Sequence, residues 1–157
     1  MSSNTDGDDY LTAAEFRAWH GSLQFTNTAI RALDVALAAA HGIFVKEFDV
    51  LITLFNAPNR KLRMTELADR VVLSASGVSH LVTRLERDGL VRRAADPNDG
   101  RSFFAELTRA GHRRLHDSRP THNAVVRAYL TDRVTPTQLS TLGDLWEAIL
   151  DAPSTDD

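Results

Sequence analysis

The sequence contains no cysteine among its 157 residues. Without thiols the chain can form no disulfide, no thiolate metal site and no cysteine-based redox sensor. No apolar run approaches the roughly 20 residues that a membrane-spanning helix needs. The first ten residues, MSSNTDGDDY, are polar and acidic, unlike a signal or transit peptide. We therefore expect a cytoplasmic protein without a membrane span, in which residues 1–10 are disordered.

The common sequence signatures of enzymes are missing as well. The chain has no Gly-rich phosphate loop, no nucleophile elbow and no H-E-x-x-H motif, and no paired carboxylates in an apolar setting. These absences favour a binding protein over an enzyme, and we expect no cofactor.

The net charge of −3 conceals an uneven distribution of charged residues. Of the 18 Lys and Arg, 12 lie between Arg60 and Arg114 with 7 of the 21 Asp and Glu, which leaves 6 basic and 14 acidic residues elsewhere. A basic segment in an acidic chain is typical of a module that contacts phosphates. A solvated surface of mixed charge is the simpler alternative.

The basic segment contains two short helices joined by a tight turn. Thr65 is placed to cap a helix over 66–71, and a second helix follows over 74–88, with Gly89 as its stop. Apolar residues recur on one stripe of the second helix, at Val78, Leu81, Val82 and Leu85. This pair of helices is typical of a helix-turn-helix.

Two strands follow, and they complete the outline of a winged helix-turn-helix. Residues 90–95 and 102–107 read as strands around a hairpin loop over 96–101. Arg92 and Arg93 lie on the first strand, where neighbours point in opposite directions, so at most one of them can face a bound DNA. DNA binding is therefore the leading hypothesis for the basic segment.

Long helices are expected on both sides of this unit. They begin at strong capping signals, such as Thr12 with Glu15 and Thr135 with Gln138, and the expected ranges are 12–40, 44–55, 109–130 and 135–149. Pro120 predicts a kink or a break in the third of them. Their apolar stripes are broader than one neighbour covers, which indicates a symmetric dimer.

The expected fold class is thus mainly α (α+β), a winged helix-turn-helix with N- and C-terminal helices that form a dimerisation region. The division of the chain is a disordered segment 1–10, a dimerisation region over 11–57 and 108–151, a DNA-binding domain over 60–107, and a polar tail over 152–157.

The segment from Leu62 to Gly111, LRMTELADRVVLSASGVSHLVTRLERDGLVRRAADPNDGRSFFAELTRAG, resembles the MarR family of bacterial transcriptional regulators. Its most specific feature is the D-P-N-D-G-R wing at this distance from the preceding helix. The resemblance implies a homodimer whose 74–88 helices enter successive major grooves of a pseudo-palindromic operator in double-stranded DNA. It also implies that Arg101, the wing arginine, reaches the minor groove.

Further DNA contacts are expected around these elements. The candidates on the recognition helix share small or hydrogen-bonding side chains, and they are Ser74, Ser76, Gly77, Ser79, His80, Thr83 and Arg84. His80 stands where many relatives have Arg, and it is either a base contact or an exposed surface histidine. Arg63 is a phosphate candidate, Arg93 is the candidate DNA contact on the first strand, and Asp99 either orients Arg101 or shapes the turn.

The resemblance also implies a small aromatic or anionic effector that releases DNA. Candidate lining residues are Trp19, His20, His41, Phe44 and Phe48, although each aromatic is more often ordinary core. His112 and His116 have helical i, i+4 spacing suited to a metal, or they are two solvated histidines. The favoured function is a repressor that binds its operator as a homodimer. The alternatives are a winged-helix module for protein contacts and a metal-responsive regulator.

Overall fold

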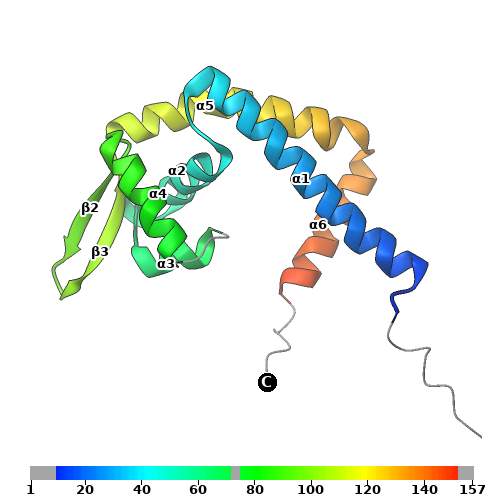
Figure 1. The fold of residues 1–157 in the computed structure, drawn as a ribbon, viewed down its shortest axis with the longest axis horizontal. Coiled ribbons are helices and arrows are strands. Elements are labelled where there is room, and N and C mark those ends of the chain that lie inside the picture. The colour runs from blue at the N-terminus through cyan, green and yellow to red at the C-terminus, as the bar shows by residue number, and fades with distance from the viewer. Residues whose placement is uncertain (1–9, 72–74, 152–157) are drawn as a thin grey trace, which may run out of the picture.

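The computed structural model describes residues 10–71 and 75–151, which form a mainly helical protein with one small sheet (Figure 1). Its described helices are α1 (Ala13–His41), α2 (Val45–Asn56), α3 (Met64–Arg70), α4 (Ala75–Arg87), α5 (Arg109–Tyr129) and α6 (Pro136–Leu150), with the 3₁₀ helices η1 (Pro58–Arg60) and η2 (Thr131–Arg133). Its strands are β1 (Lys61–Arg63), β2 (Val91–Asp96) and β3 (Asp99–Leu107). The predicted fold class is confirmed.

Side-chain caps begin the long helices where the sequence predicted them. The Thr12 amide donates to Glu15 Oε2 at 2.7 Å and the Glu15 amide donates to Thr12 Oγ1 at 3.3 Å, which closes the capping box of α1. An equivalent box begins α6 at Thr135. The cap predicted at Thr65 is wrong, because α3 begins at Met64 and the Glu66 carboxylate instead accepts the Arg63 amide at 2.9 Å.

The wing hairpin, formed by β2 and β3, is longer and has a tighter turn than predicted. The strands pair as far as Asp96 and Asp99, so only Pro97 and Asn98 form the turn, and the Asn98 amide donates to Asp96 Oδ1 at 2.9 Å. The predicted loop over 96–101 is therefore wrong. The sheet also contains β1, which the sequence did not predict, in the order β1-β3-β2.

Helix α5 continues through Pro120. The sequence predicted a kink or a break at this residue, and the helix is not broken. Proline removes one backbone hydrogen bond, but contacts on both sides of it hold the helix together. Leu115 is buried against the core before the proline, and after it His122 stacks on Phe48 with ring centroids 4.3 Å apart.

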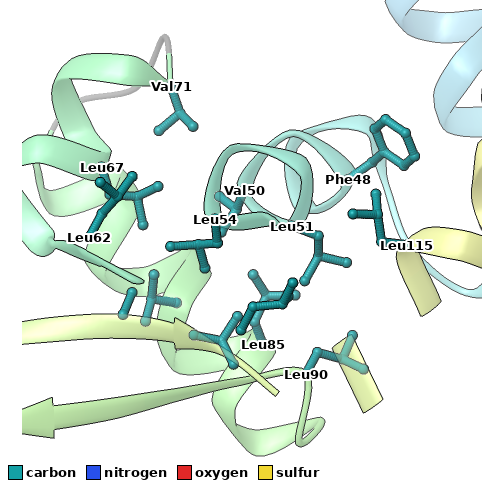
Figure 2. Packing of buried hydrophobic residues seen from close by; sticks show 14 of the residues in the cluster. Phe48, Val50, Leu51, Leu54, Leu62, Leu67, Val71, Leu85, Leu90 and Leu115 are labelled. Carbon is teal, nitrogen blue, oxygen red and sulfur yellow. The ribbon is translucent and has the colours of Figure 1, made fainter. Parts of the chain in front are cut away.

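The hydrophobic core fixes which face of α4 points outward (Figure 2). Val78, Val82 and Leu85 of α4 are fully buried, as the helical spacing predicted, whereas Leu81 is only partly buried. Burying a side chain of this size contributes about 1.5–3 kcal/mol. Residues of α2, β3 and α5 complete the cluster, including Leu51, Leu54, Ala105 and Leu115. The polar face of α4 is left exposed.

Helix α6 and the N-terminal half of α1 extend away from this core (Figure 1). No residue of α6 is buried, although Leu145, Trp146, Ile149 and Leu150 are apolar. On α1, Phe16 and Trp19 are more than half exposed. Across the described parts of the chain, no helix combines the length and apolar character needed to cross a membrane.

Candidate nucleic-acid interface

The outward face of α4 carries several of the residues predicted to contact DNA. Ser79, His80 and Thr83 are exposed along this face, and Gly77 lies half-buried near the helix start. Ser74 lies outside the described residues, and so does the side chain of Ser76. A helix held by one apolar stripe, with short polar groups opposite, has the form needed to enter a major groove.

Arg93 joins the wing hairpin to α4. Its Nη2 donates to the Ser79 carbonyl oxygen at 3.0 Å and to Thr83 Oγ1 at 2.9 Å, while Nη1 lies 3.3 Å from Glu86 Oε2. The Arg93 amide also donates to Glu86 Oε1 at 3.1 Å. These bonds fix the wing hairpin relative to α4, and they occupy the guanidinium that was predicted to contact DNA.

Arg92 lies on the opposite face of β2, where it pairs with Glu106 across the sheet at 2.8 Å. The prediction that neighbouring arginines on this strand point in opposite directions agrees with these two sets of partners. Arg92 therefore faces away from α4.

Arg84 has a partner inside the protein. Its Nε lies 2.9 Å from Oε1 of Glu47, a carboxylate that is only 2% exposed, and its guanidinium lies over the Phe44 ring at 5.2 Å from the centroid. Oε2 of Glu47 also accepts the Phe44 amide at 2.8 Å. The structure thus places Arg84 between α4 and the start of α2, where it pairs with a buried carboxylate while 42% of its side chain stays exposed.

Asp99 shapes the turn of the wing hairpin. Its Oδ2 accepts the Ser102 hydroxyl at 2.6 Å and its Oδ1 accepts the Arg101 amide at 3.0 Å. These two hydrogen bonds hold the pKa of the Asp99 carboxyl below its ordinary value, and the bond from the Ser102 hydroxyl has the larger effect. Of the two roles expected for Asp99, the contacts match turn formation. Within the described chain the Arg101 guanidinium, which is exposed, has neither a hydrogen-bond nor an ion-pair partner.

Arg63 anchors β1 to the wing hairpin. Its Nη2 lies 2.7 Å from Oδ2 of Asp96, whose side chain is 1% exposed, and its guanidinium lies 5.8 Å from the centroid of the Phe104 ring. Half of the Arg63 side chain stays accessible, so a phosphate contact remains sterically open. The roles of Asp96 and Glu47 as ion-pair partners were not predicted from the sequence. The available signal for Glu47 was a charged residue inside an apolar helical stripe.

The five residues predicted to line an effector pocket do not come together in one chain. His41, Phe44 and Phe48 lie around the α1–α2 turn, where Nε2 of His41 is hydrogen-bonded with Thr121 Oγ1 at 2.8 Å and Phe48 is core. Trp19 and His20 lie near the other end of α1, about 30 Å away at 1.5 Å per residue. Two hollows between α1 and α5, with Asn27, Thr28 and Tyr129 in both, contain none of the five.

The two histidines considered for metal binding have separate environments. His112 stacks on Phe55 with ring centroids 5.3 Å apart, and His116 Nδ1 lies 3.2 Å from Asp117 Oδ1 in solvent. Among the residues that the structure describes, no group of three or more His, Cys, Asp or Glu is placed to hold a metal ion.

Known proteins with this fold and sequence are transcriptional regulators, not enzymes. A family model described as MarR family matches residues 41–102. The HTH-type transcriptional repressor YetL of Bacillus subtilis is 32% identical over 114 residues, which cover 71% of this chain and 68% of YetL.

Two MarR family transcriptional regulators from Streptomyces coelicolor match in structure. Sco3205, solved in complex with DNA, has a TM-score of 0.86 and 36% identity over 93% of each chain. AbsC has a TM-score of 0.82 and 30% identity, over 90% of this chain and 95% of its own.

The matched region contains α4, strand β2 with Arg93, which attaches the wing hairpin to α4, and the first part of β3 as far as Ser102. On this geometry and these similarities, the chain belongs to the MarR family and is a DNA-binding transcriptional regulator with a winged helix-turn-helix.

Proposed function

We propose that this protein is a repressor that binds a pseudo-palindromic operator as a homodimer. The observation that carries the proposal is the joined unit of α4 and the wing hairpin. The guanidinium of Arg93 ties the two elements together, which leaves the polar face of α4 and the guanidinium of Arg101 exposed. The resemblance to Sco3205, which was solved with DNA, and to the repressor YetL supports it.

The residues divide between reading DNA and positioning the readers. The direct contacts we propose are short or exposed side chains at the start of α4 together with the wing arginine: Ser74, Ser76, Gly77, Ser79, His80 and Arg101. The positioning group consists of side chains that join α4 to β2 or α2, or that shape the turn of the wing hairpin: Thr83, Arg84, Arg93 and Asp99. Arg63 belongs to both groups, because it pairs with Asp96 and is still half-exposed.

The homodimer is proposed from the apolar surface of α1 and α6. A single chain leaves Trp19, Leu145 and Ile149 more than half exposed. A second copy that covers these residues would form the dimerisation region over 11–57 and 108–151, with 60–107 as the DNA-binding domain. Two such domains at fixed spacing suit two half-sites about one helical turn apart.

Release from DNA by a small aromatic or anionic effector is the last part of the proposed function. Its support is the pair formed by Phe44 and Arg84, in which the guanidinium lies over a ring that is 42% exposed, next to α4. A compound that bound there would act directly on the attachment of α4. A metal-responsive regulator is not favoured, because His112 and His116 have different partners.

The test is binding of the purified full chain to duplex DNA over a range of salt concentrations. Operator sites are first selected from random duplexes, and the affinity is then measured by fluorescence anisotropy. Each phosphate neutralised contributes about −0.9 to the slope of log affinity against log salt, so we expect a steep fall. A flat salt response, as expected of a winged helix used only for protein contacts, would overturn the proposal.

Two arginines of the wing hairpin provide a matched pair of variants. Arg101→Ala should weaken operator binding about tenfold and reduce the salt slope by about 1, without lowering the melting temperature. Arg92→Ala removes an arginine from the face turned away from α4 and should bind like the parent. Equal affinity of the Arg101→Ala variant and the parent would refute the assignment of Arg101.

A further inference from the structure

The pairing of the strands shows which side of the wing hairpin faces α4. Successive side chains of a strand point to opposite faces, and residues directly opposite each other on paired strands share a face. Ala105 of β3 is fully buried in the core and lies opposite Arg93 of β2, whose guanidinium bonds to Ser79 and Thr83 of α4. The face that contains Ala105 and Arg93 is therefore the one turned toward the recognition helix.

Phe103 lies on this same face, one step farther from the core. It is two residues from Ala105 along β3 and lies opposite Ala95, which is two residues from Arg93 along β2. Nothing larger than the methyl group of the exposed Ala95 stands across from it, and the Phe103 side chain is 47% exposed. An aromatic ring thus lies accessible between the α4 attachment and the turn of the wing hairpin.

Phe104, the next residue of β3, is also aromatic but has different surroundings. Phe104 points to the opposite face, where Lys61 lies over its ring at 5.0 Å from the centroid and Arg63 lies at 5.8 Å. That ring is partly buried among side chains of the sheet, so its position is explained by packing. Packing within the described chain does not account for Phe103 in the same way, because nearly half of its surface is open.

The surroundings of Phe103 identify the surface that covers it. The α4 face enters the major groove in the proposed function, and the turn with Arg101 reaches the adjacent minor groove. The sugar–phosphate backbone runs between two adjacent grooves, so it must pass the stretch of the wing hairpin where Phe103 lies. Deoxyribose carbons are the apolar part of that backbone.

We propose that Phe103 is an apolar DNA contact that packs against deoxyribose between the two grooves. The inference rests on the proposed function and adds a contact of a different kind from the arginines. A phenyl ring neutralises no phosphate, so its contribution to affinity is independent of salt concentration. Covering a half-exposed aromatic ring is worth about a tenfold change in affinity.

The experiment compares Phe103→Ala with Phe104→Ala on the selected operator duplex. We expect Phe103→Ala to bind about tenfold more weakly at every salt concentration, with the slope of the parent and a melting temperature no lower than that of Phe104→Ala. Phe104→Ala should lower the melting temperature, because Lys61 and Arg63 lose the ring that they cover, and its affinity should stay within about twofold of the parent.

Two further substitutions at position 103 separate apolar contact from other roles. Phe103→Leu keeps an apolar side chain and should recover most of the affinity. Phe103→Lys should recover affinity only at low salt, with a slope steeper by about 1, because it adds a phosphate contact. Parent-like binding by Phe103→Ala, or a fall in its melting temperature without loss of affinity, would refute the proposal. If the parent itself fails to bind duplex DNA, the proposed function fails instead.

Discussion

Gly111 permits the close approach of α5 to the base of the wing hairpin. A β-carbon at this position would clash with the carbonyl oxygen of Leu90 and would lie 2.8 Å from Cδ1 of Leu107. The Gly111 amide also donates to Thr108 Oγ1 at 3.0 Å, and the Thr108 hydroxyl donates to the Gly89 carbonyl oxygen at 2.7 Å. The glycine therefore allows the first turn of α5 to pack directly against the end of the sheet.

We expect Gly111→Ala to destabilise the protein by about 1–3 kcal/mol. The carbonyl oxygen of Leu90, with which the new β-carbon would clash, is a backbone atom and cannot move aside as a side chain would. The free energy of unfolding from urea titration measures this. Gly143→Ala is the matched control, since a β-carbon on Gly143 of α6 meets nothing within 4 Å. That control should be neutral or stabilising by up to about 1 kcal/mol. Equal stability of the Gly111→Ala variant and the parent would show that α5 is not held this closely.

At the scale of single residues, the sequence predicted which side chains are polar and exposed better than it predicted their partners. Ser79 and His80 are exposed, as the helical spacing required. Arg84 was expected to contact DNA, but its partner Glu47 lies 37 residues earlier in the chain. No local pattern encodes a contact over that separation. Two of the three hydrogen-bond donors around the Glu47 carboxylate, Nε and Nη2 of Arg84, become apparent only when α2 and α4 are packed together.

Among the elements, the Glu47–Arg84 pair joins α2 to the recognition helix. Both carboxylate oxygens of Glu47 are used, because Oε1 lies 2.9 Å from Arg84 Nε while Oε2 accepts the Phe44 amide and Arg84 Nη2. The carboxylate is almost wholly buried, whereas the Arg84 side chain is 42% exposed. Removing the arginine would leave a buried negative charge with a single backbone donor.

We expect Arg84→Ala to destabilise the protein by about 1–3 kcal/mol, less than a fully buried pair because solvent still reaches the Arg84 side. Arg87→Ala is the control on the same helix. Arg87 pairs with the exposed Asp88, and its loss should cost below about 0.5 kcal/mol. Thermal unfolding of both variants measures the difference. The double substitution Glu47→Leu with Arg84→Met should recover stability, because no buried charge remains. Similar losses in Arg84→Ala and Arg87→Ala would contradict the role given to the pair.

The helices were more predictable than the sheet for a physical reason. A capping box is formed by residues three positions apart, so Thr12 with Glu15 and Thr135 with Gln138 signal their helices locally. Strand β1 has only three residues and is stabilised by pairing with β3, more than 40 positions later. The wing hairpin also has a register shift between Ala95 and Asp96, an irregularity that the alternation of side chains along a strand does not predict.

For the whole molecule, the clearest feature is that α6 buries no residue. Its capping box and Pro136 make it a well-specified helix, yet Leu145, Ile149 and Leu150 remain more than half exposed. A short helix gains most of its stability from packing an apolar face against a neighbour. The sequence indicated this from the breadth of the apolar stripes, and one chain alone does not provide the missing neighbour.

The double substitution Leu145→Asp with Ile149→Asp should therefore convert the proposed dimer into monomers. Burying an unpaired carboxylate costs several kcal/mol, so the dimer dissociation constant should rise by about 100-fold or more. Analytical ultracentrifugation measures the oligomeric state. Operator affinity should fall with it, because each domain would then bind one half-site without the other.

Ser140→Asp is the control for added charge on α6. Ser140 is exposed and lies nine residues from Ile149, which is half a turn out of phase at 100° per residue and therefore on the opposite side of the helix. This variant should remain dimeric and bind the operator like the parent. If Leu145→Asp with Ile149→Asp also stayed dimeric, α6 could not be the contact between subunits, and the exposed part of α1 around Trp19 would have to provide it alone.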